Sequence, residues 1–151
     1  MLEKRYIKVL LQAFIGIVGI AFIGSQAWAG ASLKVDPATV EMNPKVMTAA
    51  KITGDGFQPD DRIVIVLVKA NKGQDVPVGS ADADAQGKFE TTMNTLSILQ
   101  GFFNMRFKEG KPVPDPNNPP LPPGDYTLKA SSWDSKAEAS CVIKVTAPEK
   151  K

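Results

Sequence analysis

The stretch from Lys51 to Val68 constrains the fold more than any other part of the chain. It ends in an unbroken β-branched and aliphatic run, Ile63–Val68, which is too short for a typical helix and is bounded by turn residues. A run of this kind is typical of a strand that is covered on both faces in the middle of a sandwich. The Gly-Asp-Gly-Phe sequence before it predicts a turn, after which Phe57 returns to the core.

Short alternating segments separated by turn residues fill most of the remaining chain. Asp36-Pro37 interrupts the first segment, which we interpret as a split edge strand, and Pro77 is typical of an edge strand. The predicted strands cover residues 32–35 with 39–42, 46–53, 62–69, 76–83, 88–93, 124–130 and 137–146. This spacing predicts an all-β, immunoglobulin-like Greek-key β-sandwich of about seven strands.

A long aromatic and proline-rich insert, residues 94–123, precedes the penultimate predicted strand. Its first half fits both a helical stripe and a strand face, and we favour a helical turn followed by a strand at 103–108. Its second half, residues 111–123, holds seven of the twelve prolines and predicts an extended, polyproline-like loop. Long loops in compact domains tend to be functional or disordered.

The N-terminal segment has the layout of a secretory signal peptide. Basic residues precede an uncharged apolar run at 13–24, and Ala27-Trp28-Ala29 supplies a small-residue cleavage site. We therefore expect residues 1–29 to be a signal peptide, 30–147 the sandwich domain and 148–151 a disordered tail. The alternative is an uncleaved anchor, which would be the protein's only contact with a membrane. Either reading places the domain in the periplasm, outside the cell or on its surface.

The composition removes several classes of function. The chain has no histidine, which is the commonest general base and metal ligand. The net charge is only +2, and the basic excess lies largely in the N-terminal segment, so we expect no nucleic-acid partner. No spacing of serine, lysine or carboxylate residues indicates a catalytic group. We expect a protein that is not an enzyme and that needs no metal or cofactor.

Two smaller features each leave an alternative open. The acidic turn at 82–87 begins like a calcium loop, but Gln86 and Met93 stand where an EF-hand needs Asp or Asn and Glu. We interpret it as a β-turn, with a weaker surface calcium site as the alternative. The single cysteine, Cys141, is expected to be an inert core residue, with an intermolecular disulfide as the alternative.

The candidate contact residues lie in the first half of the insert. Two adjacent phenylalanines cannot both face inward if that segment is a strand, so part of the insert should be exposed. The alternative is that the phenylalanines and Met105 complete the core. The predicted partner or ligand contacts are Leu99, Phe102, Phe103, Met105 and Phe107.

Three motifs resemble those of bacterial immunoglobulin-like surface modules. They are ITGDGFQPDDRIVI at 52–65, ADADAQGKF at 81–89 and LPPGDYTLKA at 121–130. The resemblance implies a sandwich in which Tyr126 bonds back to the backbone. The first two motifs are also similar to the neocarzinostatin family of small apolar-ligand carriers, although the disulfides of that family cannot be made with one cysteine.

The sequence therefore predicts an exported module that works by binding. Its partner would be a protein or a cell-envelope polymer, contacted through residues 96–123. The first alternative is a carrier that holds a small apolar ligand in a cleft beside the same aromatic residues. A hydrolase with a pair of facing carboxylates is a third hypothesis.

Overall fold

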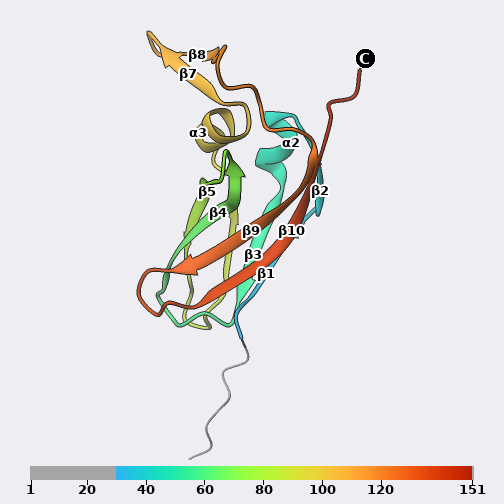
Figure 1. Ribbon diagram of the computed structural model, residues 1–151. Coiled ribbons are helices and arrows are strands. Elements are labelled where there is room, and N and C mark those ends of the chain that lie inside the picture. The colour runs from blue at the N-terminus through green and yellow to red at the C-terminus, as the bar shows by residue number, and fades with distance from the viewer. Residues whose placement is uncertain (1–29, 151) are drawn as a thin grey trace, which may run out of the picture.

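The computed structural model describes residues 30–150, so the predicted signal peptide lies outside the described residues. Two packed β-sheets form the body of the domain (Figure 1). The three-stranded sheet has the order β1 (Ser32–Asp36), β3 (Lys51–Asp55), β6 (Phe89–Thr92). The five-stranded sheet has the order β2 (Thr39–Glu41), β10 (Glu138–Thr146), β9 (Gly124–Ser132), β4 (Arg62–Asn71), β5 (Gln74–Asp82).

The strand order confirms the predicted all-β, immunoglobulin-like sandwich. The chain changes sheets between β3 and β4, between β5 and β6, and again between β6 and β9. The first strand is split as expected, because β1 pairs antiparallel with β3 whereas β2 pairs in parallel with β10. Strand β5 lies at an edge of its sheet, as Pro77 predicted. With β1 and β2 counted as one split strand, the sandwich has the seven predicted strands.

The central apolar run differs from the prediction in its burial. Ile63, Ile65 and Leu67 of β4 are buried, whereas the valines that alternate with them are only half-buried. The expectation of a strand covered on both faces was therefore wrong. The three-stranded sheet covers the inner face, but no layer of the described chain covers the outer face. Successive side chains of a strand point to opposite faces, so only every second residue reaches the core.

A second correction concerns residues 46–53, which were predicted to be one strand. Residues Pro44–Ala49 form helix α2, and β3 begins only at Lys51. The Asn43 side chain caps the helix by accepting a hydrogen bond from the Lys45 amide at 3.0 Å. Proline is favoured at the first helical position because its missing N–H would have no partner there. The helix buries only Met47, which covers one end of the core.

The turn between β3 and β4 packs as predicted. Phe57 is buried, and its ring lies 5.5 Å from that of Phe89, centroid to centroid. Gly54 is needed for this packing, since a Cβ there would lie 2.1 Å from the Phe89 ring.

The acidic turn at 82–87 is a β-turn, as predicted. The Asp84 carboxylate accepts hydrogen bonds from the amides of Gln86 and Lys88, each at 2.9 Å.

The last two strands follow the predicted alternation, with Cys141 as the exception. Leu128 and Ala130 of β9 are buried and Tyr126 on the same face is half-buried. On β10, Ala139, Ile143 and Val145 are buried, whereas Cys141, predicted to be a core residue, is only partly buried against the core. The Tyr126 hydroxyl donates to the carbonyl of Pro122, the backbone contact that the resemblance implied. Residues 147–150 form no helix or strand.

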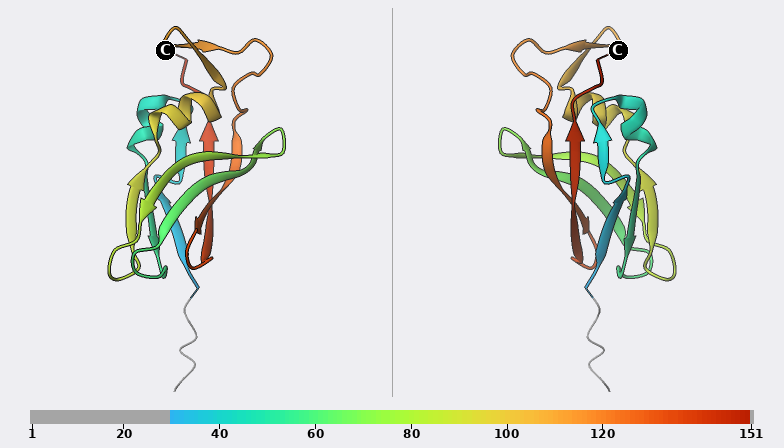
Figure 2. Two further views of the ribbon diagram at one scale, coloured as in Figure 1. Left: turned by 90° about the vertical axis from the view of Figure 1, so that its left-hand side faces the viewer. Right: turned by 90° about the vertical axis from the view of Figure 1, so that its right-hand side faces the viewer.

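The insert covers one end of the sandwich and then extends beyond it (Figures 1 and 2). A short helix, α3 (Thr95–Ser97), continues into a single π-helical turn, η1 (Ile98–Phe102). Strands β7 (Met105–Lys108) and β8 (Lys111–Pro114) then form a separate hairpin. The prediction of a helical turn followed by a strand is confirmed. The prediction of an extended loop from residue 111 was wrong for β8, which pairs with β7.

Candidate functional site

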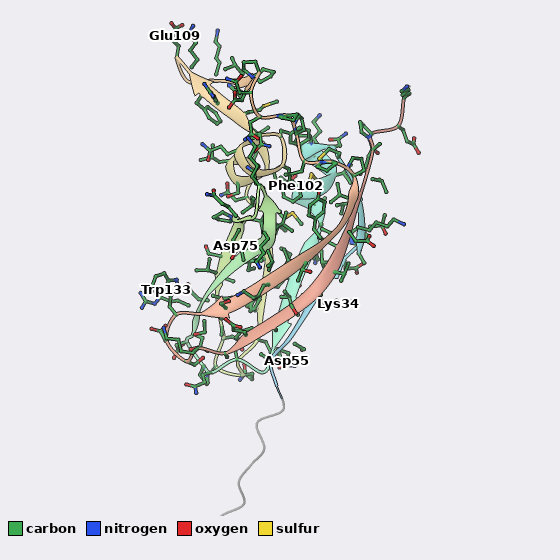
Figure 3. All side chains as sticks on the ribbon, in the orientation of Figure 1. Lys34, Asp55, Asp75, Phe102, Glu109 and Trp133 are labelled. Carbon is green, nitrogen blue, oxygen red and sulfur yellow. The ribbon has the colours of Figure 1, made fainter. Side chains whose placement is uncertain are left out.

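The base of the insert is fixed to the sandwich through Phe102 and its neighbours. The Phe102 side chain has an exposed fraction of 0%, and Figure 3 places it between the helical segments and the strands. Gly101 lies so close to β5 that a Cβ on it would be 2.2 Å from a methyl group of Val76. The Leu121 amide donates to the Phe102 carbonyl at 2.7 Å, which ties the end of the insert to its beginning.

Asn104 links the start of the hairpin to the end of β4 and to the proline-rich segment that follows β8. Its side-chain oxygen accepts a hydrogen bond from Asn71 at 2.9 Å, and its side-chain nitrogen donates to the Pro119 carbonyl at 2.6 Å. The residue is buried and has a φ of 49°, a left-handed conformation in which asparagine is several-fold enriched. The root of the hairpin is therefore held by a side chain whose polar groups are both used.

The five predicted contact residues do not share one environment. Phe102 is a core residue, so its assignment to a contact surface was wrong. Because the segment is helical rather than extended at this point, Phe102 turns inward and Phe103 remains half-buried against the core. Leu99 and Met105 are also half-buried. Phe107 is 42% exposed.

The hairpin has one apolar face and one basic face. Residues directly opposite each other in a sheet lie on the same face, and Met105 pairs with Pro114 while Phe107 pairs with Pro112. These four residues are the apolar face of the hairpin. The basic face consists of Arg106, Lys108, Lys111 and Val113.

The turn of the hairpin is a tight two-residue turn. Glu109 and Gly110 have φ values of 51° and 77°, the positive values that a type I′ turn requires at both central positions. Figure 3 shows Glu109 at the tip, away from the body of the domain.

An ion pair fixes the charged side of the hairpin. Arg106 Nε donates to Asp115 Oδ2 at 2.7 Å. The Asn117 amide and the Arg106 guanidinium, which both donate to this carboxylate, hold the pKa of Asp115 below its usual value. Asp115 thus remains charged in mildly acidic solution and keeps Arg106 in place.

Neither of the two hollows that adjoin the insert involves the aromatic residues. The larger, of about 450 Å³, lies between β5 and residues 91–97. The smaller has a volume of about 260 Å³ and lies between the turn that joins β4 to β5 and the helical turn. Its lining is mostly polar or small, and it contains no phenylalanine: Asn71, Gln74, Asp75, Val76, Pro77, Ser97, Gln100 and Gly101.

In the described part of the chain, four large exposed apolar side chains lie outside the five predicted contact residues: Val46, Leu96, Trp133 and Val142. Leu96 is 50% exposed and belongs to the predicted contact stretch 96–123, whereas Trp133, in the turn between β9 and β10, is 66% exposed and was not predicted. Figure 3 shows Trp133 at a distance from the hairpin. A tryptophan between Ser132 and Asp134, in a polar turn with no apolar neighbour in sequence, is the signal that could have identified it.

A buried carboxylate near Trp133 has a structural role. Asp61 is 3% exposed, and its Oδ2 accepts from the Gln58 amide at 3.0 Å and from the Ser135 hydroxyl at 2.6 Å. These bonds connect the turn before β4 to the turn after β9. Among residues 30–150, no group of three or more Asp, Glu or Cys side chains is placed to hold a metal ion. Within the same range no helix is long and apolar enough to cross a membrane.

Comparison with known proteins assigns no family. No family model matches the chain, and neither does any curated protein. One similar solved structure is the tetra-tandem repeat in the extending region of a large adhesion protein, with 17% identity and a TM-score of 0.41. The match covers 76% of this chain and 23% of that one, so this chain spans about a quarter of that structure. A likeness of this size assigns no function.

Proposed function

We propose that the protein is an exported, non-enzymatic binding module of the bacterial periplasm or cell surface. Its contact with a partner protein or envelope polymer is made through the insert hairpin, residues 105–114. The observation that carries this proposal is the exposed apolar face on a hairpin that extends beyond the sandwich. Apolar side chains that the domain does not cover gain free energy when a partner removes them from water.

The construction of the hairpin supports a role other than stability. An isolated two-stranded hairpin is at best marginally stable in water, and Phe107 contributes nothing to the core of the domain. Yet its base is held by Phe102, Asn104 and the Arg106–Asp115 pair. A rigid base reduces the entropy lost when the hairpin binds, which favours recognition.

Ligand carriage is less well supported than surface contact. A carrier needs a concave, mostly apolar pocket that encloses its ligand. The two hollows beside the insert, of about 260 and 450 Å³, have no aromatic side chain in their linings. The apolar side chains of the hairpin instead lie on a protruding surface.

A capture experiment on envelope extract tests the proposal. The full-length chain, purified from the envelope fraction, is compared with Phe107→Ser and with Trp133→Ser as a matched exposed aromatic away from the hairpin. We expect the parent and Trp133→Ser to retain the same partner and Phe107→Ser to lose it, with all three melting alike. Equal capture by all three proteins would refute a role for the hairpin.

A further inference from the structure

The proline spacing in β8 determines which backbone groups of the hairpin are free. In a two-residue hairpin the closing pair, here Lys108 and Lys111, exchanges both backbone hydrogen bonds, and bonded and non-bonded pairs then alternate. Phe107–Pro112 and Met105–Pro114 are therefore non-bonded pairs. Both prolines stand where the backbone nitrogen points away from the partner strand, so neither removes a hydrogen bond from the hairpin.

The two outer edges of the hairpin consequently differ. The outer edge of β8 has no N–H donor at Pro112 or Pro114, so it cannot form a regular ladder with another strand. The outer edge of β7 presents the N–H and C=O groups of Met105 and Phe107. Within residues 30–150, no loop or side chain hydrogen-bonds to the backbone of either residue.

The sandwich protects its own edges more fully. Strands β5 and β6 lie against each other where the two sheets meet. The Asn94 amide, just after β6, donates to the Val78 carbonyl at 2.8 Å, and the Thr91 hydroxyl donates to the Ser80 carbonyl at 3.2 Å. On the other side, β1 lies against β10, and the edge strand β2 of the five-stranded sheet is only three residues long. The outer edge of β7 has no comparable cover among the described residues.

The side chains beside this edge indicate what kind of strand would fit. Residues 105–114 carry three basic side chains and one acidic side chain, a net charge of +2. Arg106 is paired with Asp115, whereas Lys108 and Lys111 form no ion pair with any described residue. A second copy of β7 would bind this edge poorly, because antiparallel pairing would place its basic side chains next to the basic side chains of the first copy. An acidic strand complements the basic face, and apolar residues alternating with the acidic ones would cover Met105 and Phe107.

We propose that the outer edge of β7 binds an extended peptide segment, with alternating acidic and apolar residues, as an added β-strand. This inference rests on the proposed function of the hairpin and specifies its binding mode and the chemistry of its partner. Main-chain bonds to Met105 and Phe107 hold the peptide, and Lys108 and Lys111 select its acidic face.

A peptide titration followed by NMR tests this mode of binding. The probe is an end-blocked octapeptide of alternating valine and glutamate, added to the ¹⁵N-labelled full-length chain, with a valine–lysine octapeptide as the charge control. We expect the amides of Met105 and Phe107 to shift and to become protected from hydrogen exchange with the acidic probe only. Absence of binding at millimolar concentration, or binding that leaves these two amides unprotected, would overturn the inference.

Two substitutions at one position separate the backbone from the side chain. Phe107→Ala keeps the outward N–H, whereas Phe107→Pro removes it without breaking a hairpin bond, as Pro112 opposite already shows. We expect both variants to melt alike and the proline variant to bind the acidic probe at least about fivefold more weakly than the alanine variant. Equal binding by the two variants would exclude strand addition.

The two proposals can fail separately. If Phe107→Ser loses the envelope partner while the acidic probe leaves the β7 amides unprotected, the hairpin is a contact surface that does not bind by strand addition. If Phe107→Ser retains the partner, the proposed function of the hairpin fails, whatever the peptide does.

Discussion

Replacing Phe102 with alanine tests whether the insert is an integral part of the fold. The side chain is fully buried, and removal of a buried phenylalanine ring typically costs about 3–5 kcal/mol in free energy of unfolding. Gly101 packs against Val76, and the Leu121 amide binds the Phe102 carbonyl, so the walls of the resulting cavity are tied in place. Because this cavity cannot collapse, we expect a loss of unfolding free energy near the upper end of that range, about 4–5 kcal/mol.

Urea unfolding followed by circular dichroism measures this loss directly. At about 4 °C per kcal/mol for a domain of this size, the melting temperature should fall by about 16–20 °C. The matched control is Phe107→Ala, whose 42% exposed ring should leave stability within about 0.5 kcal/mol. A loss below about 1 kcal/mol in Phe102→Ala, with an unchanged urea dependence, would show that the insert is not anchored through this ring.

Three further predictions concern other parts of the domain. Gly54→Ala should destabilise it by about 1–3 kcal/mol in the same urea assay, because the new Cβ would lie 2.1 Å from the Phe89 ring, and unchanged stability would refute this packing. Hydrogen bonds from Arg62 lower the pKa of Asp134 below its ordinary value of 3.8. The free energy of unfolding lost in Asp134→Asn should therefore be constant above pH 3.8 and should shrink as the pH falls below it. Urea unfolding curves taken on both sides of pH 3.8 measure this difference. Burial raises the pKa of the Cys141 thiol, so a thiol reagent should label the folded protein slowly and the urea-unfolded protein rapidly. A disulfide-linked dimer on a non-reducing gel would instead support the intermolecular alternative.

The parts of the fold that could be predicted from sequence are those in which one local rule decides the outcome. The Gly-Asp-Gly-Phe turn, the edge position of the strand that contains Pro77 and the split first strand each follow from residues that restrict the backbone strongly. The inward face of β10 follows from alternation alone. In these places local preference and tertiary packing agree.

The failures occurred where two rules competed. Asn43-Pro44 fits both a turn and a helix start, and the alternation that followed favoured a strand, although the cap and Met47 select a helix. The prolines of β8 favoured an open loop, because only knowledge of the pairing register reveals that both nitrogens point outward. Phe102 and Phe103 could not be distinguished, since their burial depends on the π-helical turn that rotates one ring inward.

The division of the first strand between the two sheets has a mechanical consequence. Gly30 precedes β1 at one end of the domain and the hairpin lies at the other (Figure 1). A pull between these ends runs nearly along the strands, so it loads the five residue pairs of β1 with β3 in shear, together with the three pairs of β2 with β10. Bonds loaded in shear must yield together, whereas bonds that are peeled open yield one at a time. A force between Gly30 and a partner bound at the hairpin would therefore act along the direction in which this domain resists extension best.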